Sequence, residues 1–118
     1  MDKLAKAAPS IRSFKVSAPI VFAPNVQVTH LKSWSDEFGY YRPMMDALLS
    51  QNNVNSVFFM PNVVSPMATI EDRAKMLAKN LSNKKKLFEN QRVHLVTHSF
   101  AGVDARAAIS LYGSDQYV

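Results

Sequence analysis

A serine near the carboxyl end of the chain stands where its hydroxyl could act as a nucleophile. Residues 92–97 form an apolar run that predicts a buried strand, Ser99 follows almost at once, and a helical pattern begins at Phe100. A strand, a sharp turn with a central serine and a helix are the context of a nucleophile elbow, in which a strained turn lifts the hydroxyl clear of the sheet. The chemistry predicted is nucleophilic attack by the serine hydroxyl.

The residues flanking this serine limit how closely the strand and the helix can approach. The positions two before and two after the serine must be small, and glycine is usual at both. Here they are Thr97 and Ala101. The spacing of the motif is therefore kept, with bulkier flanks.

Three short apolar runs predict the strands that would position this turn. They lie at residues 19–23, 56–60 and 92–97, and the first two stop at the pairs Pro24-Asn25 and Pro61-Asn62. Continuous apolar runs without strict alternation are typical of strands that are buried on both faces.

Amphipathic stretches separate the runs and predict helices over residues 41–48 and 70–81, with a third over 100–112 that ends at Gly113. Thr69 is the expected N-cap of the second. The apolar positions of the first two are Tyr41, Met44, Met45 and Leu48, then Ile70, Ala74, Leu77 and Leu81. Strands that alternate with helices predict the α/β class, a parallel sheet flanked by helices and joined by right-handed crossovers.

Composition excludes several classes of protein. The chain has 118 residues, 47% of them hydrophobic, which suits a single domain with its own core. It has no cysteine, so disulfides, cysteine–zinc sites and thiol catalysis are excluded. No apolar run reaches the roughly 18 residues that cross a bilayer, and no apolar run follows the basic start as a secretory signal requires. The expected location is intracellular and not secreted.

The chain is basic, with a net charge of +5. A basic surface can favour an anionic membrane, nucleic acid or an acidic protein. The run Lys84–Lys86 is interpreted as the solvated end of a helix. Nucleic acid is disfavoured because no aromatic residues interleave with the basic ones to stack on bases. Residues 1–18 form a basic, acid-poor extension with a faint likeness to a mitochondrial address, and residues 19–118 form the domain.

The chain resembles a known family over residues 19–113. Val93–Arg106 with Leu111–Gly113 resembles the elbow and following helix of the bacterial triacylglycerol lipases, which have the α/β-hydrolase fold. Upstream, residues 19–23 resemble the first central strand of that family. Residues 38–48 resemble its aromatic loop and first helix, and residues 64–77 resemble the entry to its second helix.

This resemblance implies roles for three residues and no cofactor or metal. Ser99 matches the nucleophile, and the backbone N–H of Phe100 matches one donor of the oxyanion hole. Val26 matches the position of the second donor. Pro24-Asn25 replaces the family's His-Gly pair in front of it, which alters the loop that aims the Val26 N–H.

The other members of a catalytic triad are not matched. The family order is serine, acid, histidine, and no histidine follows Ser99. His94 is interpreted as a packed sheet residue and His98 as a packing residue whose side chain points away. His30 would need a rearranged geometry to take part. Asp104 is expected to be structural, paired with Arg106 or nearby backbone.

The resemblance therefore implies an incomplete α/β-hydrolase fold, a half-domain. The strand ending at Thr97 would show an unpaired apolar edge, so we expect a protein partner, a second half-domain or an assembly neighbour, to complete the sheet. Two functions are open. One is a catalytically inactive structural subunit of a larger complex, with a mitochondrial complex as one option. The other is the nucleophile-bearing half of a split lipase or esterase, acting on a lipid or ester, whose Asp and His come from a second chain.

Overall fold

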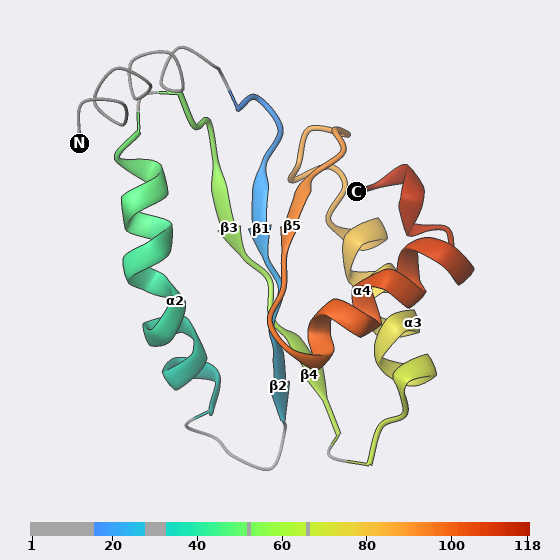
Figure 1. Cartoon of the computed structure of the whole chain (residues 1–118). Coiled ribbons are helices and arrows are strands. Elements are labelled where there is room, and N and C mark those ends of the chain that lie inside the picture. Colours follow the sequence, from blue (N-terminus) through green and yellow to red (C-terminus); the bar gives the residue numbers. More distant parts are fainter. Residues whose placement is uncertain (1–15, 28–32, 52, 66) are drawn as a thin grey trace, which may run out of the picture.

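The computed structural model describes residues 16–27, 33–51, 53–65 and 67–118. The elements in chain order are β1 (Ile20–Phe22), β2 (Asn25–Gln27), α2 (Ser33–Leu49), β3 (Val57–Phe59), β4 (Asn62–Val64), α3 (Ile70–Asn83), β5 (His94–Val96), α4 (Phe100–Leu111) and a 3-10 turn (Ser114–Gln116) (Figure 1). Strands and helices alternate, apart from the two short strands that directly follow β1 and β3.

The central sheet is parallel, with the strand order β3-β1-β5. Ile20 lies opposite Val57 on one side and opposite His94 on the other. Each of the three predicted runs contains one of these strands. The α/β prediction, a small parallel sheet flanked by helices, is therefore confirmed at this level.

The first two runs stop at the Pro-Asn pairs, as the sequence predicted, and a further short strand begins at each asparagine. β2 and β4 begin at Asn25 and Asn62, which lie opposite each other in a second parallel pair. The Asn62 N–H donates to the Pro24 carbonyl at 2.8 Å. Because the first pair has Phe22 opposite Phe59, the two prolines fall at the same level. The missing proline N–H groups therefore break both strands at one point, beyond which pairing resumes.

Helix α2 covers one face of the sheet, and α3 and α4 cover the other (Figure 1). On the α2 face, Tyr41 and Met45 pack with Ile20 and Phe22. On the other face the fully buried residues include Val21, Ala74, Leu77, Leu81 and Ala108. These two cores hold the sheet between its helices.

Two of the predicted core positions are exposed instead. Met44 is 44% exposed and Ile70 is 46% exposed. A sheet of three strands is narrow, so it covers only one stripe of α2. Ile70 is the first residue of α3, so it lies beyond the region where that helix packs on α4 and the sheet.

The predicted start of α3 and end of α4 are confirmed, whereas α2 begins at Ser33, eight residues before the predicted start at residue 41. The Thr69 hydroxyl accepts a hydrogen bond from the Asp72 N–H, and the Asp72 carboxylate accepts from the Thr69 N–H, which together form a capping box. Gly113 has a φ of 76°, in the left-handed region, two residues after the end of α4. Lys84–Lys86 follow α3 and are exposed.

Strand β5 lies at the edge of the sheet and is the most exposed of the central strands. His94 and Val96 are both exposed. The outer edge carries one backbone contact, in which the Val93 N–H donates to the Tyr117 carbonyl at 2.7 Å. Beyond that point, β5 pairs with no other strand of the described residues on this side. The expected open edge is therefore present in the described part of the chain.

The described part of the chain begins before the predicted domain boundary at residue 19. Val16 forms a parallel bridge with Val54, and its N–H donates to the Asn53 carbonyl. Residues 16–18 are thus attached to the domain, and residues 1–15 lie outside the described part of the chain.

Candidate functional site

Ser99 adopts the strained turn that the sequence predicted. Its φ is 57° and its ψ is −127°, and it lies between the end of β5 and the start of α4. A positive φ is uncommon in a residue with a Cβ, and this ψ lies outside the left-handed helical region. Such a conformation costs on the order of 1–3 kcal/mol and persists where the surrounding structure enforces it. Here β5 and α4 impose it.

Two polar groups of this turn, the Ser99 hydroxyl and the Phe100 N–H, have no partner among the described residues. Ser99 is exposed, and its hydroxyl neither caps α4 nor bonds to any other described residue. The Phe100 N–H, at the first position of α4, donates to no described acceptor. The first N–H groups of a helix have no partner within the helix and carry partial positive charge. A carbonyl oxygen next to Ser99 would therefore find a donor at Phe100.

The close approach of strand and helix involves a residue that the sequence analysis did not use. A Cβ placed on Gly102 would lie 3.3 Å from the Thr97 hydroxyl oxygen. Ala101, the expected small flank, is buried. The glycine that follows Ala101 is therefore what makes room for Thr97, and its place directly after the motif was the available signal.

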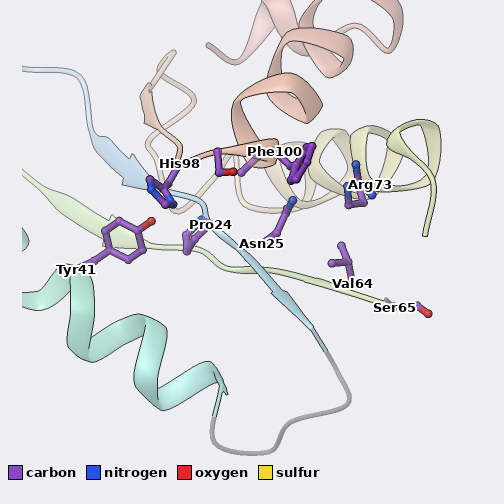
Figure 2. A pocket seen from close by; sticks show the side chains of 10 residues that line it. Pro24, Asn25, Tyr41, Val64, Ser65, Arg73, His98 and Phe100 are labelled. Atoms are coloured by element: carbon purple, nitrogen blue, oxygen red, sulfur yellow. The ribbon is translucent and has the colours of Figure 1, made fainter. Parts of the chain in front are cut away.

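A cleft with a volume of about 340 Å³ opens in front of Ser99 (Figure 2). This volume is at the small end of the range for ligand pockets. Its lining residues are Pro24, Asn25, Tyr41, Val64, Ser65, Arg73, His98, Ser99, Phe100 and Ala101. They come from the Pro24-Asn25 pair between β1 and β2, from α2 and α3, from the end of β4, and from the turn between β5 and α4. The cleft therefore lies at the carboxyl ends of β1 and β5.

The structure brings two of the three predicted site residues together. Ser99 and Phe100 both line the cleft. Val26 is 4% exposed, pairs with Val63 in the β2–β4 ladder, and does not line the cleft. Its neighbour Asn25 does line it.

Both described histidines differ from their predicted environments. His98 is exposed, lines the cleft and has its ring 6.4 Å from that of Tyr40, so the expectation that it points away and packs is wrong. His94 is exposed rather than packed. Both predictions assumed a covered sheet, whereas β5 is an edge strand. Neither histidine hydrogen-bonds to Ser99, and His30 lies outside the described residues.

Asp104 has a structural environment, as expected, but with other partners. It is fully buried, and its Oδ2 accepts from Arg73 Nε at 2.8 Å and from Asn25 Nδ2 at 2.7 Å. Arg73 also donates from Nη1 to the Ala68 carbonyl at 2.8 Å. The expected pairing with Arg106 is wrong, because Arg106 is exposed. Two residues along a helix point in directions about 200° apart, so the pair could not meet.

Comparison of the whole chain with known proteins does not identify a family. No family model matches the chain, and no curated protein is similar to it. Within the described residues, no group of three or more histidine, aspartate or glutamate side chains gathers where a metal ion could bind. None of the helices in the same residues combines the length and apolar character needed to cross a membrane.

Proposed function

We propose that this chain is the nucleophile-bearing part of an α/β-hydrolase that acts on esters, with Ser99 as the nucleophile. The observation that carries the proposal is the backbone of Ser99, with φ 57° and ψ −127°, at the mouth of a cleft. Backbone strain of this kind gathers at functional sites. The resemblance to the bacterial lipases rests on the same residues, 93–106.

The chemistry follows from the groups at the turn. Ser99 Oγ forms a bond to the ester carbonyl carbon while its proton passes to a base, and the oxyanion accepts a hydrogen bond from the Phe100 N–H. Collapse of this intermediate breaks the bond to the alcohol, which takes the proton from the base and leaves an acyl-serine. Water then releases the acid by the same two steps.

The base is the group that the described residues do not supply. No histidine or carboxylate among them hydrogen-bonds to Ser99. Losing the base costs a serine hydrolase roughly a millionfold in turnover. Activity therefore requires a histidine and an acid from outside the described residues.

We further propose that a second polypeptide brings these groups by extending the sheet at β5. The His94 N–H donates inward to the Pro19 carbonyl. The backbone N–H and C=O of Leu95, the next residue, therefore point to the outer edge. Val96 is 36% exposed at this edge and Val103 of α4 is 49% exposed. A parallel strand paired with β5 would cover unpaired backbone groups and apolar side chains that monomers rarely leave open.

A second candidate function is a structural subunit of a larger complex, a mitochondrial one among the options, without catalysis. One observation favours it. Val26, which matches the second oxyanion donor, lies in the β2–β4 ladder and not in the cleft. An oxyanion hole with one donor loses on the order of 10²–10³ in rate. The chain would then keep the fold and its interaction edge only.

Hydrolysis of a small panel of aryl esters by the natively purified protein, with the proteins that copurify, separates the two candidates. We expect turnover that Ser99→Ala abolishes. Ser110→Ala is the matched control, because Ser110 is also exposed and lies on α4, the helix that directly follows Ser99. No turnover by the assembled protein, or turnover that survives Ser99→Ala, contradicts the hydrolase proposal.

A further inference from the structure

We propose that Asn25 is a specificity-determining residue, because its hydrogen bond to Asp104 sets the width of the cleft in front of Ser99. Asp104 acts through Asn25 as a positioning residue. We call the set Asn25, Asp104 and Arg73 the polar clamp. The inference deepens the proposed function, and rests on it in taking Ser99 as the reacting residue. The feature behind it is a hydrogen bond between a wall of the cleft and the helix that begins at the elbow.

The clamp joins two parts of the chain that are 79 residues apart. Asn25 follows Pro24, and both residues line the cleft. Asn25 Nδ2 donates to Asp104 Oδ2 at 2.7 Å. Figure 2 shows the Asn25 side chain pointing toward the helix that starts at Phe100. Because Asp104 belongs to that same helix, this bond fixes the distance between the Pro24–Asn25 wall and Ser99.

The anchor of the clamp is rigid. Asp104 is fully buried, and the same Oδ2 atom accepts from Arg73 Nε at 2.8 Å. Arg73, whose side chain is 17% exposed, is itself held by the Ala68 carbonyl. Hydrogen bonds that involve a charged group are about twice as strong as neutral ones. Strand β2 and helices α3 and α4 thus meet at a single carboxylate oxygen.

The attachment of this wall to α4, in contrast, depends on one side-chain bond, while the backbone of Pro24 and Asn25 is held to β4 by the strand pair. Asn25 Oδ1 and Asp104 Oδ1 are buried and accept no hydrogen bond from any described residue. Asn25 is therefore held to α4 through Nδ2 alone. Removing this one amide would detach the wall from α4 and leave both the β2–β4 pairing and the Asp104–Arg73 ion pair in place.

The neighbouring strand provides a natural control. Asn62 lies opposite Asn25 in the β2–β4 pair and is 1% exposed. It donates to the Arg73 carbonyl at 3.1 Å and accepts from Asn80 Nδ2 at 3.2 Å, so it too joins a strand to a helix. It does not line the cleft in front of Ser99. Replacing Asn62 thus disturbs the structure without opening the wall.

The test uses a thiol at the position of the nucleophile. The chain has no cysteine, so Ser99→Cys places one reporter in the cleft. Its rate of alkylation is measured with a small reagent, N-methylmaleimide, and with a bulky one, N-pyrenylmaleimide. The ratio of the two rates cancels the intrinsic reactivity of the thiol, and the Asn62→Ala variant controls for partial unfolding, which would also raise the ratio. Asn25→Ala and Asn62→Ala are each introduced into this background.

We expect Asn25→Ala to raise the ratio of the alkylation rate with the bulky reagent to that with the small reagent roughly tenfold. This is the size of effect that losing one hydrogen bond to a charged group gives. Asn62→Ala leaves the ratio unchanged. Asn25→Ser, a milder change whose hydroxyl falls short of Asp104, gives the same direction if Asn25→Ala unfolds. An unchanged ratio in the Asn25 variants, or an equal rise in Asn62→Ala, overturns the inference. Alkylation needs no catalytic base, so a chain without esterase activity still gives a decisive result.

Discussion

Arg73 reaches from α3 to the fully buried carboxylate of Asp104 on α4, with Nε 2.8 Å from Oδ2. Arg73 also lines the cleft that Ser99 and Phe100 face. The ion pair fixes α3 against the helix that begins at the elbow, so it supports the geometry on which the proposed chemistry depends.

Breaking this ion pair should cost more than removing it whole. Arg73→Met leaves a buried carboxylate without its cation, and we expect the free energy of unfolding to fall by about 3–5 kcal/mol. The double variant Arg73→Met/Asp104→Leu should recover much of that loss, since neither charge remains. Urea unfolding of the four proteins measures the coupling. A double variant as unstable as the sum of the single ones contradicts a direct pair.

Relief of strain at Ser99 should stabilise the protein. Glycine adopts a positive φ without penalty, so Ser99→Gly should raise the free energy of unfolding by about 1 kcal/mol or more. Ser110→Gly, inside α4, should lower it by about 1 kcal/mol. Chemical denaturation distinguishes the two. A loss of stability in Ser99→Gly would mean that the turn is not strained.

The exposed apolar side chains of α4 should matter for association and little for folding. Val103 and Leu111 are 49% and 71% exposed, so Val103→Lys and Leu111→Lys should change the stability of the chain alone by less than about 0.5 kcal/mol. Both should reduce the recovery of the copurifying partner. Met67→Lys, on the loop after β4, is the control at an apolar residue that is still more exposed. Full recovery with both α4 variants would exclude this surface as the interface.

One exposed ion pair gives a pH-dependent prediction. Glu71 lies 3.0 Å from Lys75 Nζ, and its hydrogen bond and its charge raise the pKa of Lys75 above the ordinary value of 10.5. The folded state therefore holds this proton more tightly, so the stabilisation is present below pH 10.5 and disappears as the pH rises through the folded pKa. Glu71→Gln should lower the melting temperature slightly at neutral pH, and the difference should vanish at high pH. Asp46→Asn, which removes the partner of the non-titrating Arg42, should show no such pH dependence.

The sequence was sufficient where local patterns decide the structure. Apolar runs contain β1, β3 and β5, and the cap at Thr69 and the glycine at residue 113 are as predicted. The strained turn at Ser99 also follows from a strand that runs directly into a helix. In each case the cause lies within a few residues of the feature.

Features that depend on distant neighbours could not be predicted in the same way. Strand pairing resumes after Pro24 only because Pro61 stands at the same level in the adjacent strand. The cation that pairs with Asp104 is Arg73 on α3, 31 residues away along the chain, so the sequence around Asp104 does not indicate it. The exposure of His98 follows from the open edge of β5, whereas its predicted packing assumed a complete sheet.

Covalent labelling with a fluorophosphonate tests the central claim most directly. The protein is purified natively with its partners, treated with the probe, and digested, and the modified peptide is identified by mass spectrometry. We predict modification at Ser99 in the assembled protein, little in the chain alone, and none in Ser99→Ala. Assembled protein that carries no label, or a label on another serine with Ser99 unmodified, would contradict the account.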